Sequence, residues 1–177
     1  MSSVAVDVRY PIGPVSIVAS YDPASRAAAI ARIAALPTRL HEAVRGLSAT
    51  QLDTRYRDGG WTLRQVVHHL ADSHLNAYVR FKLVATEIDP PLKVWDENAW
   101  AALPDARGPI GGSLLLVTSL HERWTQFLRE LPAAAFARTG MHAHRGPLTL
   151  DALLSIYSWH GDHHAAHITA LRRRMGW

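Results

Sequence analysis

Apolar side chains recur every three or four residues along four long stretches of this chain. That spacing places them on one face of an α-helix, and no stretch shows the sustained alternation that is typical of a β-strand. The four stretches span residues 23–46, 62–86, 113–131 and 149–175. Amphipathic helices can bury their apolar faces against one another, so the pattern predicts an all-α four-helix bundle.

Local signals predict where the first two helices bend, begin and end. Thr62 followed by Gln65 is a capping box that opens the second helix, and the Asp-Pro-Pro sequence at residues 89–91 closes it. Pro37 lies inside the first helical pattern, where it removes one backbone hydrogen bond. We therefore expect a kink or a brief break near Leu36.

Shorter segments are expected to connect the long helices. Residues 1–22 contain prolines and a glycine but no sustained period, which predicts an extended N-terminal arm. Short extra helices are expected in the connections, at residues 48–51 and 96–103. A polar connection before the last helix contains His142 and His144, which are expected to be solvated loop histidines.

Composition and charge narrow the class of protein. The 177 residues are 48% hydrophobic and 19% charged, so residues 1–177 are expected to form a single globular domain. No membrane-spanning run or signal pattern is present, which predicts a cytoplasmic protein without a membrane partner. The net charge of +4 comes from scattered basic residues, apart from three arginines at 172–174 that complement the dipole of the last helix. Nucleic acid is therefore not expected as a partner.

The last helix carries histidines within its apolar face. His160, His164 and His167 fall within about 40° of one another on a helical wheel, and His163 lies at the edge of this group. A buried polar group without a partner costs roughly 1–3 kcal/mol, so these imidazoles need partners. His160 and His164 are spaced i, i+4 and can present two nitrogens to one metal ion. The alternative is a buried histidine-rich helix that is satisfied by hydrogen bonds.

A third metal ligand has to come from another helix, and the second helix offers two candidates. His74 lies near the middle of its apolar face, whereas His69 lies about 60° outside that face on a polar strip. Periodicity does not choose between them, and the one that is not a ligand would be a satisfied core or surface histidine. The chain has no cysteine, so only nitrogen and oxygen donors are available. Such donors suit zinc, nickel, iron or manganese.

Six segments together resemble the YfiT branch of the DinB superfamily over nearly the whole chain. They are residues 10–13, 51–54, 59–62, 65–74, 159–169 and 173–177. The resemblance implies a metal-binding four-helix bundle, generally homodimeric, whose relatives are described as metal-dependent hydrolases and in some cases as bacillithiol S-transferases. The family holds its metal with one histidine of the second helix and an H-x-x-x-H pair on the last. This implies that His69, His160 and His164 are the ligands here.

Three imidazoles leave an open position on a divalent ion, which is typical of a catalytic metal site. We therefore expect one such ion per chain, zinc or nickel ahead of iron or manganese. The resemblance implies an enzyme that transfers a low-molecular-weight, bacillithiol-like thiol onto an electrophilic small molecule. A hydrolase that uses metal-bound hydroxide is the alternative. A non-catalytic metal-binding module is a second alternative.

Helical facing suggests supporting roles for residues around the metal. Asp72 or Asp162 could orient a ligand imidazole through its other ring nitrogen. Arg80 could bind a carboxylate of the thiol. The remaining candidates for residues that support the ligands are His74, His163 and His167.

Overall fold

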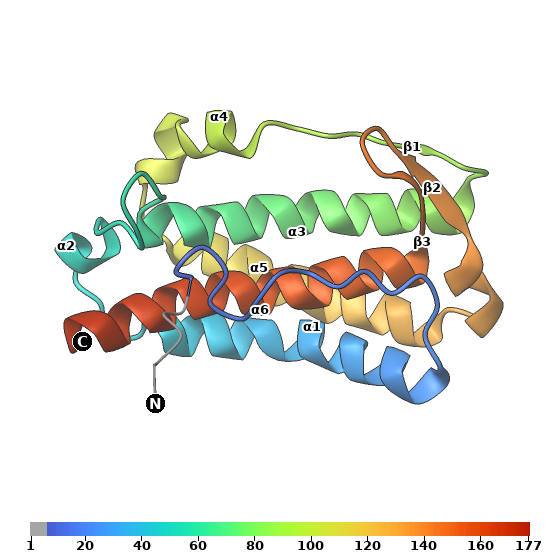
Figure 1. Cartoon of the computed structure of the whole chain (residues 1–177), viewed down its shortest axis with the longest axis horizontal. Helices are drawn as coiled ribbons and strands as arrows, with labels where there is room; N and C mark the ends of the chain where they lie inside the picture. The colour runs from blue at the N-terminus through green and yellow to red at the C-terminus, as the bar shows by residue number, and fades with distance from the viewer. Residues whose placement is uncertain (1–6) are drawn as a thin grey trace.

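The computed structural model describes residues 7–177, and four long helices dominate it (Figure 1). They are α1 (Pro23–Val44), α3 (Leu63–Thr86), α5 (Gly111–Glu130) and α6 (Leu150–Met175). The predicted all-α four-helix bundle is confirmed. Helices α1 and α3 each pack on both α5 and α6, so they occupy opposite corners of the bundle. Within residues 7–177 no helix has the length and apolar character that crossing a bilayer requires.

The long helices follow an up-down-down-up order along the chain. Arg26 near the start of α1 pairs with Asp151 near the start of α6, and Arg172 near the end of α6 donates to the carbonyl of Ala43 near the end of α1. These two helices are therefore parallel. Helices α3 and α5 run in the opposite direction and are parallel to each other (Figure 1). The connection between α3 and α5 consequently returns along the whole bundle.

Short elements and the N-terminal arm complete the connections. The arm, residues 7–22, runs along α6, where the Val18 amide donates to Ser155 Oγ at 3.1 Å and the Tyr21 amide donates to Asp151 Oδ2 at 2.9 Å. The expected short helices are thus present, and so is the expected arm over residues 7–22; its residues 1–6 lie outside the part of the chain that the structure describes. The short helices are α2 (Ala49–Leu52), α4 (Glu97–Ala101), η1 (Pro104–Arg107) and η2 (Ala133–Ala137).

The sequence predicted a kink or a brief break near Leu36; helix α1 continues without interruption through Pro37, so the brief break is wrong. The missing amide hydrogen of Pro37 leaves the carbonyl of Ile33 without its helical donor. A side chain of α5 replaces that donor, because His121 Nδ1 lies 2.7 Å from the Ile33 oxygen. The freed carbonyl is therefore satisfied, and the helix does not need to open at this point.

A small three-stranded sheet was not expected from the sequence. It consists of β1 (Pro91–Leu92), β2 (Thr139–His142) and β3 (Gly146–Thr149), with β1 parallel and β3 antiparallel to the central β2. Its strands have two to four residues each, which is too short for an alternating pattern to stand out. Gly140 lets β2 approach the end of α3 closely, because a Cβ there would lie 2.7 Å from Val84 Cγ2.

The core consists of two apolar clusters separated by a layer of histidines. The first cluster includes Ala77, Trp124 and Tyr157, and the second includes Ala71, Val117 and Ala165. On α3, α5 and α6 the change from one cluster to the other occurs around the same level of the bundle. Three imidazoles occupy that level, one from each of these helices: His74, His121 and His160. The histidines therefore form one continuous polar layer across the bundle, and they are not separate polar residues scattered through the apolar core.

Candidate metal centre

Three histidines from α3 and α6 converge on one point. His69 projects from α3, while His160 and His164 project from successive turns of α6. One ring nitrogen of each lies within 4.8 Å of the corresponding nitrogens of the other two. The Nε2 atoms of His69 and His160 face each other at 3.2 Å. The structure thus brings together the three residues that the family resemblance assigned as ligands.

Burial keeps these three imidazoles in their neutral form. Desolvation, reinforced by the nearby His163 and His167, lowers the pKa of His69 to about 3. Burial also holds the pKa of His160 and of His164 well below the usual value of 6.5, with the neighbouring histidines adding to the effect. A neutral imidazole keeps a free lone pair, which is the form that binds a metal ion.

The donor set fits a divalent metal ion. Two nitrogens bound to a tetrahedral zinc at about 2.0–2.1 Å lie about 3.3–3.4 Å apart, close to the separation of the His69 and His160 Nε2 atoms. The Nδ1 atoms of His69 and His164 are buried and have no hydrogen-bond partner within residues 7–177. Among the described residues, this is the one group of three or more histidine and acidic side chains whose ligand atoms converge as a metal site requires.

The three histidines lie on the wall of a pocket of about 1020 Å³. Two tryptophans cover His69: the Trp61 ring centre lies 4.5 Å from the His69 ring centre and the Trp95 ring centre 5.9 Å away. The N-terminal arm and the β2–β3 hairpin form other parts of the wall. Four arginines line the pocket, against two acidic side chains, so its surface is basic. These arginines are Arg9, Arg57, Arg80 and Arg145, and the acidic residues are Asp96 and Glu97.

The hairpin brings two histidines to this pocket that the sequence assigned to a solvated loop. His142 is half-buried, and burial together with the charges of Arg80 and Arg145 lowers its pKa. His144 remains exposed but also lines the pocket. The expectation of simple loop histidines is therefore wrong for His142, because pairing of β2 with β3 folds the loop over α6.

Of the candidate supporting residues, His74 contacts a predicted ligand directly. Its imidazole is fully buried, and its Nε2 lies 3.0 Å from Nδ1 of His160. His160 thus faces His69 with one ring nitrogen and His74 with the other. The two histidines that periodicity ranked equally both contact His160, on opposite sides of its ring.

His163 and His167 lie beside the three predicted ligands and stack on aromatic rings. The His163 ring stacks on Trp159 with centres 4.3 Å apart, and the His167 ring stacks on Tyr56 at 4.1 Å. His167 Nε2 also lies 3.2 Å from the carbonyl oxygen of Arg9 in the N-terminal arm. Both residues therefore line the pocket and hold the arm and the α2–α3 connection against α6.

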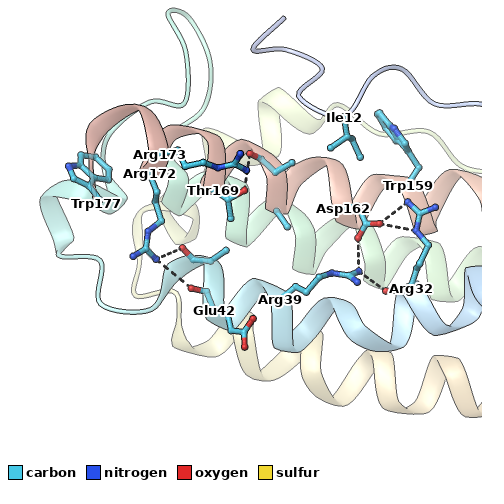
Figure 2. A pocket seen from close by; sticks show the side chains of 13 residues that line it. Ile12, Arg32, Arg39, Glu42, Trp159, Asp162, Thr169, Arg172, Arg173 and Trp177 are labelled. Carbon is cyan, nitrogen blue, oxygen red and sulfur yellow. Dashed lines mark hydrogen bonds and ion pairs between the residues drawn. The ribbon is translucent and has the colours of Figure 1, made fainter. Parts of the chain in front are cut away.

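The two candidate carboxylates lie away from the ligand imidazoles. Asp162 belongs to a groove between α1 and α6, where it accepts hydrogen bonds from Arg32 at 2.9 Å and Arg39 at 2.5 Å (Figure 2). Asp72 is half-buried, and burial followed by the charge of Asp105 raises its pKa. Neither residue lines the metal pocket. The structure therefore does not support a carboxylate that orients a ligand ring. Asp162 lies on the face of α6 that packs on arginines of α1, and Asp72 lies outside the pocket.

Arg80 does line the pocket, where it also holds the side chain of Tyr157. Its Nη1 donates to the hydroxyl oxygen of Tyr157 at 2.6 Å, and its Nη2 donates to the carbonyl of Lys93. Burial raises the pKa of Tyr157, so its hydroxyl stays protonated. Since that oxygen already accepts from Arg80, its own hydrogen is available to a group in the pocket.

The depressed histidine pKa values predict how the metal-free protein responds to acid. In the unfolded chain these residues gain protons below about pH 6.5, while in the folded chain His69 stays neutral down to about pH 3 and His121 down to about pH 4. The unfolded state then binds more protons, so the free energy of unfolding falls as the pH falls from 6.5, by about 1.4 kcal/mol per pH unit for each such histidine.

Thermal unfolding of metal-free protein at several values between about pH 7.5 and 4.5 tests this expectation. The melting temperature should decrease steeply below about pH 6.5 and change little above it. A flat profile between about pH 7 and 5 would contradict the burial of neutral histidines.

The fold and the site together define a class of protein: a helical bundle whose candidate metal centre lies between two facing helices. Comparison with known families then identifies the family. The model of the DinB superfamily matches residues 24–168, and this chain belongs to that superfamily.

Similar proteins cover almost the same length as this chain. A protein of Bacillus mycoides strain KBAB4, named "Putative metal-dependent hydrolase", is 46% identical over 171 residues, which is 97% of this chain and 99% of the relative. A protein of Bacillus cereus strain 03BB102 with the same name is 45% identical over the same shares. Among solved structures, YfiT of Bacillus subtilis superposes with a TM-score of 0.94 at 46% identity, covering 97% of this chain and 99% of that one. It is described as a probable metal-dependent hydrolase with an unusual four-helix bundle topology.

Proposed function

We propose that this protein is a metal-dependent enzyme that transfers a low-molecular-weight thiol onto an electrophilic small molecule. The observation that carries the proposal is the convergence of three neutral imidazoles, His69, His160 and His164, on the wall of an open, basic pocket. Bound by these nitrogens, a divalent ion such as zinc or nickel supplies Lewis acidity that favours the thiolate form of a thiol. The pocket volume of about 1020 Å³ suits two small reactants.

The basic surface of the pocket supports an anionic thiol as the first substrate. Arg80 and Arg145 both lie close enough to His142 to lower its pKa by their charge, which places these cations on one side of the pocket. Arginine binds carboxylates through paired hydrogen bonds. The thiol that fits this surface therefore carries at least one carboxylate.

The remaining wall supports an apolar electrophile and a proton donor for its leaving group. The Trp61 and Trp95 rings offer aromatic surface beside His69. Tyr157 lies next to His160, with ring centres 6.0 Å apart, and its hydroxyl hydrogen is free to donate into the pocket. In the overall reaction a carbon–sulfur bond forms, the carbon–halogen bond of the electrophile breaks, and the thiol proton leaves with the halide.

The test is an activity assay on protein reloaded separately with zinc, nickel, manganese and iron. Each form is incubated with a chlorinated acceptor and either a carboxylated thiol, such as mercaptosuccinate, or the neutral 2-mercaptoethanol. We expect thioether formation with at least one metal, with kcat/KM roughly tenfold higher for the carboxylated thiol because an added charge-assisted hydrogen bond contributes about 1.4 kcal/mol or more. Equal rates with and without metal would contradict the proposal.

A hydrolase is the second candidate, and the names of the relatives favour it. The same donor set and pocket suit a metal ion that activates water. Amide and ester substrates presented to the same reloaded protein distinguish the two activities. Turnover of these substrates without thioether formation would replace the transferase with the hydrolase.

A further inference from the structure

We propose that His74 and His121 are positioning residues that hold His160 in the tautomer with its proton on Nδ1 and its lone pair on Nε2. Together with His160 they form a hydrogen-bonded series across the bundle, here called the histidine relay. The inference rests on the proposed metal site, because the Nε2 lone pair of His160 is the one that faces His69.

The relay is continuous from α6 to α1. His160 Nδ1 lies 3.0 Å from His74 Nε2, His74 Nδ1 lies 2.8 Å from His121 Nε2, and His121 Nδ1 lies 2.7 Å from the carbonyl oxygen of Ile33. The rings of His74 and His121 are nearly parallel, with centres 4.9 Å apart and planes at 10°, as an in-plane hydrogen bond between them allows. His74 is fully buried and His121 is 1% exposed, so solvent does not compete for these contacts.

The direction of every hydrogen bond in the relay follows from the carbonyl at its end. A carbonyl oxygen only accepts, so His121 must carry its proton on Nδ1. A neutral imidazole has a single N–H, which leaves His121 Nε2 as an acceptor and makes His74 Nδ1 the donor to it. The same step repeated assigns the His74 lone pair to Nε2 and the His160 proton to Nδ1.

The rings remain neutral because nothing in the relay favours a charged form. Within residues 7–177 no carboxylate hydrogen-bonds to His74, His121 or His160, and all three rings lie between the two apolar clusters of the core. An extra proton would place a cation in this layer without a counter-ion, at a high desolvation cost. One proton per ring is therefore the stable arrangement.

Pro37 makes the terminal acceptor available. In an uninterrupted helix the amide of residue 37 would donate to the carbonyl of Ile33, but proline has no amide hydrogen. That carbonyl faces α5 and accepts from His121. A proline on α1 thus frees the acceptor that sets the proton position on a histidine of α6 through two intervening imidazoles.

The first test needs no substitution and no metal. Long-range ¹H–¹⁵N NMR of metal-free protein with labelled histidine, at about pH 7.5, distinguishes a protonated from an unprotonated ring nitrogen. We expect His74, His121 and His160 each to be protonated on Nδ1 alone. A proton on Nε2 of any of them would overturn the relay, and this result does not depend on whether the enzyme transfers a thiol or binds metal.

The second test removes the middle of the relay. His121→Phe leaves His74 Nδ1 without its acceptor, so His74 can reverse its proton and the His160 tautomer is expected to shift toward Nε2–H. Metal affinity should then fall roughly 10–100-fold, the usual effect of losing a residue that orients a ligand. A folded His121→Phe protein with the original His160 tautomer and unchanged affinity would contradict the proposal.

Thr125→Val is the matched control for this substitution. Thr125 is a buried residue of the same helix, and its hydroxyl donates to the backbone carbonyl of His121 and not to a relay ring. We expect it to keep both the His160 tautomer and the metal affinity.

Pro37→Ala supplies a variant that retains all three histidines. Its new amide competes for the Ile33 carbonyl, so the His121 Nδ1–H proton resonance should move upfield. An unchanged resonance would contradict the role given to Pro37.

Discussion

Replacing His160 by alanine is expected to abolish metal uptake. His160 offers Nε2 to the site at 3.2 Å from the His69 Nε2, and with His164 it supplies the two nitrogens that come from one helix. Its loss leaves two imidazoles on different helices, and it also removes the hydrogen-bond donor to His74 Nε2. Because both a ligand and its support are lost, the decrease in affinity should exceed the roughly 10–100-fold effect of a supporting residue alone.

Metal analysis after equilibrium dialysis measures this effect. His41→Ala is a suitable control because His41 is an exposed histidine of α1 with a weak 3.4 Å contact to Thr118. We expect the control to bind one divalent ion per chain and His160→Ala to bind less than about a tenth of that under the same conditions. Full stoichiometry in His160→Ala would show that the ion is held elsewhere.

The four helices were predictable because each carries a long periodic pattern, and α3 also carries local signals at both ends. The capping box at Thr62 and Gln65 is present, with both reciprocal hydrogen bonds formed. The sheet was not predictable, since β1 and β3 contain prolines and only two and four residues respectively. The pairing of β1 with β2 also joins residues 50 positions apart, such as Pro91 and Met141, which the bundle brings together.

The candidate site was predictable in part. The ambiguity concerned which histidine of the second helix is a ligand, and it arises because His160 has two ring nitrogens, each with its own neighbour. Periodicity could not separate His69 from His74 because both contact His160, one at Nε2 and the other at Nδ1. Family resemblance selected His69, and one of its ring nitrogens lies within 4.8 Å of those of His160 and His164. A helical wheel describes one helix at a time and does not show which ring nitrogen a neighbour will face.

His121 was missed because it is the one histidine of α5 and forms no motif along the chain. Two signals could have found it. It lies between Val117 and Trp124 in the apolar face of its helix, and Pro37 leaves a carbonyl on α1 in need of a donor. Neither signal is specific alone, and their connection exists only once α1 packs against α5.

Asp162 shows the opposite error, in which a plausible role did not survive packing. It lies two residues from His160 in sequence, but that offset turns its side chain by about 200° on the helix. Its carboxylate therefore meets the arginines of α1, two turns apart at positions 32 and 39 (Figure 2). The position of Asp162 close to His160 in the sequence predicted that its carboxylate lies near the metal. Its partners are instead Arg32 and Arg39, because α1 is the helix that packs on this face of α6.

Removing the carboxylate of Asp151, which forms a buried ion pair with Arg26, is expected to lower the free energy of unfolding strongly. Asp151 is 2% exposed and accepts from Arg26 Nε at 2.8 Å, from Arg26 Nη2 at 2.7 Å and from the Tyr21 amide at 2.9 Å. Asp151→Ala leaves a largely buried guanidinium without its counter-ion, with the Tyr21 carbonyl as its remaining acceptor, and leaves the Tyr21 amide without a partner. Losing one member of a buried pair costs roughly 3–5 kcal/mol. Since about 1 kcal/mol shifts the melting temperature of a chain of this size by roughly 2–4 °C, we expect a decrease of about 6–20 °C.

A matched pair of variants distinguishes burial from charge as the cause. Arg64 donates to Asp53 at 2.7 Å in the same way, but the Asp53 side chain is 59% exposed, so Asp53→Ala should cost only about 0–1 kcal/mol. Arg26→Met combined with Asp151→Leu removes both charges and should recover most of the stability lost in Asp151→Ala, because no ion is left buried without a partner. Equal melting temperatures for Asp151→Ala and Asp53→Ala would contradict this account.

Because Asp151 also accepts from Tyr21, its loss should release the end of the N-terminal arm from α6 and make residues 7–22 more sensitive to limited proteolysis than in the Asp53 variant.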